Sequence, residues 1–137
     1  MMQFYFLSVI LNILSGIVLS SDRLGNRMAK AGILREFLSQ HGNLKLGLAI
    51  LSFLIGIFKL LSVTRGDVII VGDLLPALAG LIMGSILALE YYQERSSSET
   101  ADLGKFSGFL LNTRQTFGLA GIIIAILHFL FPGVLFL

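Results

Sequence analysis

Four polar residues interrupt long apolar segments of the chain: Asn12, Lys59, Asp73 and His128. An ionisable side chain at the centre of a bilayer costs about 2.5–3.5 kcal/mol, so such residues are functional candidates by default. A lysine and an aspartate at one depth can neutralise each other, and a histidine beside a carboxylate can exchange protons near neutral pH. Together the four residues form a candidate intramembrane polar site for an ion or small solute.

The four residues can meet only if they lie at similar depths. With a rise of about 1.5 Å per residue, Lys59 and Asp73 both fall roughly 6–8 Å inside the same membrane boundary. The connection between them is short, so their two segments form a hairpin and a salt bridge between them is expected. Asn12 and His128 fall in the same half of the bilayer, which predicts a polar pocket open to the outside.

A structural interpretation of the same residues is favoured over the pocket. Lys59 can extend its ammonium group to the outer headgroups, and Asp73 can cap the start of a helix. Asn12 can bond across a helix contact, and His128 can face a neighbouring carbonyl group. These roles need no ligand.

The elements that would position these residues are membrane-spanning helices. The chain has 137 residues, of which 55% are hydrophobic and 13% charged, against about 25% charged in soluble domains. A spanning helix needs roughly 20 apolar residues, and four continuous segments approach that length: residues 4–20, 46–63, 68–89 and 116–137. We predict an all-α fold, with residues 1–137 forming a single integral membrane domain of two similar helical hairpins.

Basic residues predict how the chain is threaded. Eight of the ten lysines and arginines lie in the loops after the first and third segments: Arg23, Arg27, Lys30, Arg35, Lys45, Arg95, Lys105 and Arg114. Because such residues are retained in the cytoplasm, both long loops should be cytoplasmic and both termini outside, in a bacterial-type inner membrane. The alternative is that the first segment is a cleaved signal peptide, but no positive charge precedes its apolar core.

Both long loops contain residues at helical spacing. In the first loop an apolar stripe consists of Leu24, Met28, Ala31, Leu34 and Leu38, and the predicted lipid-contacting cations are Arg23, Arg27, Lys30 and Arg35. Such a helix should lie in the plane of the bilayer surface, with its cations facing anionic headgroups. The second loop has a possible capping box at Ser96 and Glu99, followed by a shorter stripe of Leu103, Phe106 and Leu110.

The two halves of the chain resemble each other weakly. Aligning Gly16 with Gly80 matches the first apolar segment to the third, and aligning Gly47 with Gly118 matches the second to the fourth. A duplication in this order would give parallel repeats related by an axis along the membrane normal. Convergence on a common hairpin is the alternative.

Small residues predict where the helices approach closely, because packing rather than apolar burial joins helices in lipid. The predicted packing residues are Gly16, Ser20, Gly56, Gly80, Gly84, Ala88, Gly121 and Ala125. These faces could hold the four helices together or join two copies of the chain, and packing within one chain is favoured.

Catalytic and cofactor chemistry is not indicated by the sequence. The chain has no cysteine, its two histidines are predicted on opposite sides of the membrane, and no phosphate-binding glycine loop is present. We expect no enzyme activity, no metal, no cofactor and no nucleic-acid partner. The leading hypothesis is a non-enzymatic subunit or self-associating scaffold of a membrane complex, with the lipid bilayer, a second copy or another membrane protein as partner. The alternative is a small transporter or channel for an ion or small solute, and a lipid-modifying enzyme is a third, weaker possibility.

Overall fold

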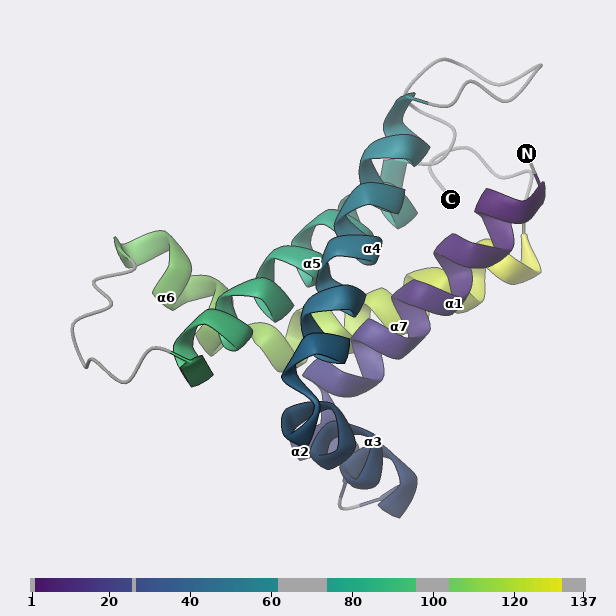
Figure 1. Ribbon diagram of the computed structural model, residues 1–137. Helices are drawn as coiled ribbons and strands as arrows, with labels where there is room; N and C mark the ends of the chain where they lie inside the picture. The colour runs from purple at the N-terminus through teal and green to yellow at the C-terminus, as the bar shows by residue number, and fades with distance from the viewer. Residues whose placement is uncertain (1, 26, 62–73, 96–103, 132–137) are drawn as a thin grey trace.

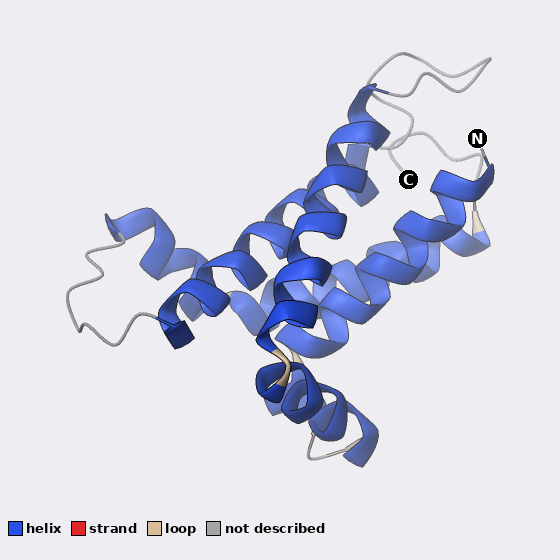
Figure 2. Ribbon diagram, in the orientation of Figure 1, coloured by secondary structure: helices blue, strands red, loops and turns tan. Residues whose placement is uncertain are grey.

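The computed structural model describes residues 2–25, 27–61, 74–95 and 104–131, and these residues form helices with no strand (Figures 1 and 2). The helices in chain order are α1 (Met2–Leu19), α2 (Ser21–Leu24), α3 (Ala29–Gln40), α4 (Gly42–Leu61), α5 (Leu74–Arg95), α6 (Gly104–Asn112) and α7 (Arg114–Leu130). The all-helical fold predicted from the sequence is therefore confirmed for the described residues.

Two of these helices, α4 and α5, are long and apolar enough to cross a membrane. A third span is obtained if α6 and α7 are taken together, although their axes meet at 62°. The apolar part of α1, Gln3–Leu19, is shorter. The structure thus has two or three candidate membrane spans, which is compatible with an integral membrane protein, whereas the four spans expected from the sequence remain a prediction.

The four apolar helices pack as two close pairs. The most extensive contacts join α4 to α5 and α1 to α7, and smaller contacts join the two pairs (Figure 1). The buried core lies where the pairs meet, and its fully buried large side chains include Leu19, Met83, Ile86 and Leu87.

Glycines allow this close packing, because several have a neighbouring backbone where a Cβ atom would be. A Cβ on Gly16 of α1 would lie 2.6 Å from the carbonyl oxygen of Gly118 on α7. On the other pair, a Cβ on Gly84 would lie 2.8 Å from the Ala49 carbonyl oxygen, and one on Gly56 2.9 Å from that of Ala77. The remaining predicted packing residues also lie against neighbours within the chain: Ser20, Gly80, Ala88, Gly121 and Ala125.

The first loop helix presents a different face from the one expected. Ala31 and Leu38 are buried, and Leu34 packs against the core, so these three residues of the predicted membrane-facing stripe cover the bundle instead, whereas Met28 is 55% exposed. Ile33 and Phe37 are the large apolar side chains that α3 exposes. The bundle supplies an apolar surface at the end of α1, and burial there outweighs contact with headgroups.

The second loop helix follows the prediction only in part. Leu110 of α6 belongs to the buried core, whereas Phe106 is 74% exposed. Leu103 and the proposed capping pair of Ser96 and Glu99 lie outside the described residues.

Candidate functional site

Two of the four predicted polar residues meet inside the bundle, at the end opposite the long loops. Lys59 Nζ of α4 lies 3.3 Å from His128 Nε2 of α7, and the two residues are 7% and 1% exposed. The two nitrogen atoms are within hydrogen-bond distance, and the tautomer of the imidazole decides which of them donates. The contact therefore joins two groups that can both hold a proton.

Tyr5 completes this cluster from α1. Its hydroxyl group donates to the carbonyl oxygen of His128 at 2.7 Å, and its ring centroid lies 4.7 Å from that of the imidazole. Lys59 Nζ lies 5.4 Å from the centroid of the same ring, within the range of a cation–π contact. Tyr5 belongs to the predicted apolar segment 4–20, and the structure places it against the buried lysine and histidine.

Asn12 is buried apart from this cluster, about two helical turns along α1 from Tyr5. Its Nδ2 atom donates to the carbonyl oxygen of Pro76 at 3.1 Å. One turn further, the hydroxyl groups of Ser15 and Ser52 lie 2.8 Å apart. The inner face of α1 is thus polar over most of its length, and these two bonds tie α1 to α5 and α4.

Asp73, the fourth predicted residue, lies outside the described residues, and so does its expected salt bridge with Lys59. The structure therefore brings together Lys59 and His128, places Asn12 at a separate helix contact, and leaves the role of Asp73 as a prediction.

An apolar layer follows the polar half of the bundle. Leu19 of α1 and Met83 and Leu87 of α5 are each at most 1% exposed and belong to one core cluster. They lie along their helices between the Asn12 and Ser15 level and the ends that carry the long loops. Ser20, which follows Leu19, is also fully buried, and its hydroxyl group donates to the Gly16 carbonyl oxygen of the same helix.

Beyond the apolar layer, buried charges form a network that the sequence analysis missed. Lys45 Nζ of α4 lies 3.0 Å from Glu90 Oε2 and 2.8 Å from Glu94 Oε1, both on α5. The side chains of Lys45 and Glu90 are only 4% and 7% exposed. Arg114, at the start of α7, bonds to the other oxygen of Glu90. One carboxylate thus joins three helices of the bundle.

The network continues to the loop helices through Asp22. Arg114 Nη2 lies 2.6 Å from Asp22 Oδ2, and Gln115 Nε2 donates to the same oxygen at 2.9 Å. Arg35 of α3 bonds to the second Asp22 oxygen. Three acids and three bases therefore connect α2 and α3 with α4, α5 and α7.

A signal for these buried charges was present in the sequence. Lys45, Ser52 and Lys59 are spaced seven residues apart, which places them on one face of a helix. All three are buried in α4. Hydropathy alone starts the second apolar segment at residue 46, so Lys45 is assigned to the preceding loop. The spacing of the three residues on one helix face is then not recognised.

The remaining predicted lipid-contacting cations differ in their surroundings. Arg23, Arg27 and Lys30 are exposed, and none forms an ion pair with another described residue. Arg35 instead pairs with Asp22. Two cations, Arg23 and Arg27, line a pocket of about 440 Å³ together with Asp22, Leu24 and Leu119.

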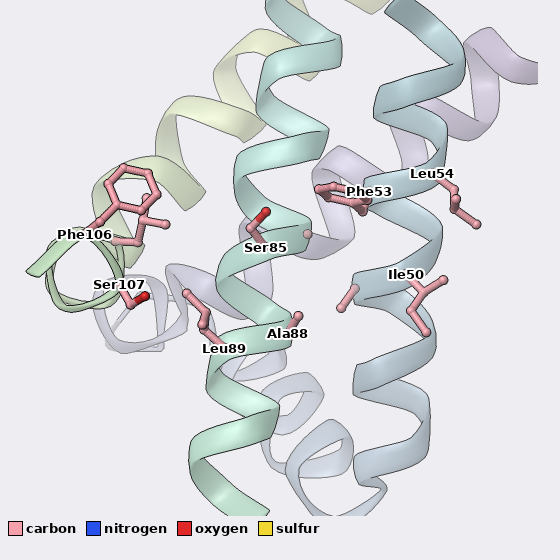
Figure 3. Close-up of a pocket in the computed structure, with 11 residues that line it drawn as sticks. Ile50, Phe53, Leu54, Ser85, Ala88, Leu89, Phe106 and Ser107 are labelled. Atoms are coloured by element: carbon pink, nitrogen blue, oxygen red, sulfur yellow. The ribbon is translucent and has the colours of Figure 1, made fainter. Parts of the chain in front are cut away.

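A second cavity, of about 500 Å³, lies between α4, α5 and α6 (Figure 3). Phe106 and Ser107 of α6 face Ser85 and Leu89 of α5 across it. Its lining contains no charged residue, and the Ser85 hydroxyl group donates to the Leu81 carbonyl oxygen. This cavity is suited to apolar chains rather than to ions. Across the described part of the chain, no group of three or more acidic or histidine residues could hold a metal ion.

Comparisons with known proteins give a family but no activity. Residues 1–128 match a family model to which no function is attached. No curated protein and no solved structure matches the chain.

Proposed function

Since this chain belongs to an uncharacterised family, we propose its function from its own structure: it is a four-span integral membrane protein that transports an ion, with proton transfer at the Lys59–His128 contact. Both termini lie outside and both long loops lie in the cytoplasm of a bacterial inner membrane. The fold, the helix pairing and the buried polar residues each support part of this proposal.

The distribution of side chains supports four spans. α1 and α7 are short for a bilayer but fall near the lower limit of about 17 residues, and α7 packs along α1 as α5 packs along α4. Their outward faces are apolar and exposed, as at Ile10 and Ile123, whereas Asn12 and His128 face inward. This arrangement is expected for helices surrounded by lipid.

The pairing of helices also supports a duplicated hairpin. If α1 corresponds to α5 and α4 to α7, the contact of α1 with α7 corresponds to the contact of α5 with α4. These are the two most extensive helix contacts. Gly16 and Gly80, which the alignment matches, each meet a backbone oxygen of the partner helix, at Gly118 and Ser52 respectively. Parallel repeats about an axis along the membrane normal predict such an exchange of partners.

The contact between Lys59 and His128 carries the proposal for transport. Two ionisable side chains buried within spanning helices are expensive and are retained mostly where they serve a pathway. They lie on one side of the apolar layer of Leu19, Met83 and Leu87, and the Lys45–Glu90–Arg114 network lies on the other. A proton-binding site, an apolar layer and a second charged site thus follow one another along the bundle. This sequence of sites is expected for a closed pathway.

Proton flux into proteoliposomes tests this proposal. Purified protein is reconstituted with a trapped pH-sensitive dye, and an inside-negative potential is imposed with potassium and valinomycin. We expect flux above that of protein-free vesicles, and its loss in Lys59→Met and His128→Phe. Lys105→Gln, which removes an exposed cation, is the control and should retain the flux. Absence of flux in the wild type, or unchanged flux in Lys59→Met, would refute the proposal.

The same assay tests the sequence-based expectation for Asp73. Asp73→Asn should abolish flux without lowering expression if the carboxylate takes part in proton transfer. Flux equal to that of the wild type would assign Asp73 to a capping role.

A non-enzymatic subunit or scaffold is the second candidate, and the exposed apolar side chains of α3 favour it. Ile33 and Phe37 are 65% and 47% exposed on the cytoplasmic helix, on the side that does not cover the bundle. A mass measurement in mild detergent should then show a complex that Ile33→Ser/Phe37→Ser dissociates. A monomer without partners would contradict this role.

A further inference from the structure

The basic residues at the cytoplasmic end fall into two groups by what they contact. Arg35, Lys45 and Arg114 are bonded to Asp22, Glu90 and Glu94. Arg23 and Arg27 form no ion pair with a described residue and line the same pocket. Two arginines that line one pocket can offer their guanidinium groups to the oxygens of a phosphate group.

The pocket combines these arginines with apolar side chains. Leu24 follows Arg23 at the end of α2, and Leu119 belongs to α7. Leu119 lies about five residues beyond Arg114, or roughly 7 Å further into the bundle. In the membrane placement proposed above, Leu119 therefore lies on the side of the pocket toward the acyl chains of a bound lipid. The pocket volume of about 440 Å³ is within the usual range of small-ligand sites, roughly 300–1,000 Å³.

Asp22 also lines the pocket, but its negative charge is already paired with cations and therefore does not prevent an anion from binding. One of its oxygens accepts bonds from Arg114 and Gln115, and the other pairs with Arg35. Two cations thus surround this carboxylate, and Arg23 and Arg27 add two further positive charges. The excess charge of the pocket is positive.

We propose that this pocket binds the phosphate headgroup of an anionic phospholipid from the cytoplasmic leaflet, with Arg23 and Arg27 as the phosphate ligands and Leu24 and Leu119 contacting the start of the acyl chains. The lipid joins α2 to α7 beside the Asp22 network. The inference rests on the membrane placement proposed above but not on ion transport.

Native mass spectrometry in an uncharged detergent tests the site. The full chain is mixed with phosphatidylglycerol, with phosphatidylcholine or with inorganic phosphate, and the retained ligand is titrated. We expect phosphatidylglycerol to be retained in preference to phosphatidylcholine. Arg23→Gln/Arg27→Gln should weaken retention at least about tenfold, because the charge-assisted hydrogen bonds from two guanidinium groups to the phosphate are lost.

The matched control is Arg95→Gln/Lys105→Gln, which removes two exposed cations outside the pocket. It should retain phosphatidylglycerol within about twofold of the wild type, given the small weight of distant exposed charges. Arg23→Lys/Arg27→Lys keeps the charge but loses the planar guanidinium groups, and we expect intermediate retention.

Equal weakening by the two glutamine double variants would overturn the site in favour of a diffuse charge effect. Retention of inorganic phosphate as strong as that of phosphatidylglycerol would overturn the assignment to a lipid. Missing proton flux in proteoliposomes would refute transport while leaving this lipid measurement unchanged, so the two failures are distinguishable.

Discussion

Lys45 Nζ lies 3.0 Å from Glu90 Oε2, with both side chains almost completely buried. Neither charge could remain at this depth alone, because an unpaired buried ion is strongly destabilising. The pair therefore fixes α4 against α5 at the level where the hydropathy of both helices falls, and Arg114 extends the same constraint to α7.

Replacing Glu90 tests how much this network stabilises the bundle. Glu90→Gln should lower the free energy of unfolding by about 3 kcal/mol, near the lower limit for breaking a buried ion pair, because Lys45 and Arg114 each keep a second carboxylate. Glu94→Gln is the control: its side chain is 47% exposed, so we expect a loss below about 1 kcal/mol. Unfolding in mixed micelles with increasing dodecyl sulfate gives both values. Similar losses in the two variants would show that burial of Glu90 does not increase its contribution to the free energy of unfolding.

Close contact between α1 and α7 is tested by adding one methyl group. A Cβ on Gly16 meets a backbone oxygen at 2.6 Å, which can be relieved only by separating the helices. Gly16→Ala should therefore cost about 1–3 kcal/mol, as overpacked cores do. Gly47→Ala in α4 has no atom within 4 Å and should be neutral or stabilising by up to about 1 kcal/mol. The dodecyl sulfate assay compares them, and a stable Gly16→Ala protein would exclude this contact in the membrane.

Membrane threading is tested with single cysteines, since the chain has none. A cysteine at Gln3 should react with an impermeant maleimide in intact cells, whereas cysteines at Lys30 or Lys105 should react only after permeabilisation. Labelling of Lys30→Cys from outside would reverse the proposed orientation. Labelling of only one of the two loop positions from the cytoplasm would reject two cytoplasmic loops.

Asp22 is expected to hold the loop helix α3 in place. Asp22→Asn weakens the bonds to Arg35, Arg114 and Gln115, so amide hydrogen exchange of α3 should become several-fold faster through local opening. Glu36→Gln removes an equal charge from an exposed position on α3 and is the control. Exchange that is unchanged in Asp22→Asn would mean that burial of Ala31 and Leu38 alone retains the helix.

The sequence predicted the apolar helices well, but misplaced the ends that carry charge. α4 begins at Gly42 rather than at residue 46, and α5 extends to Arg95 rather than residue 89. Hydropathy falls at Lys45 and Glu90, so a prediction from hydropathy places the helix ends there. The helices continue because the two charges neutralise each other inside the bundle, and that pairing depends on contacts between distant parts of the chain.

For the candidate site, the sequence predicts how deep each polar residue lies along its helix. It does not predict which neighbouring helix the side chain faces. Counting residues placed Lys59 and His128 in the same half of the bilayer, and the structure shows them in contact. The same count placed Asn12 with them, but Asn12 bonds to the Pro76 carbonyl oxygen instead. Which residue meets which is set by the rotation and pairing of the helices, and the first helix packs chiefly against the last.

This pairing has a consequence for how the protein is made. The main partner of α1 is α7, which is synthesised after all the other described helices. Until then Tyr5 lacks the carbonyl oxygen that accepts the hydrogen bond from its hydroxyl group, and the Gly16 surface has no backbone against it. In the proposed four-span arrangement, α1 therefore inserts before the helix that shields its polar side from lipid has been made, and the bundle closes only after α7 has followed.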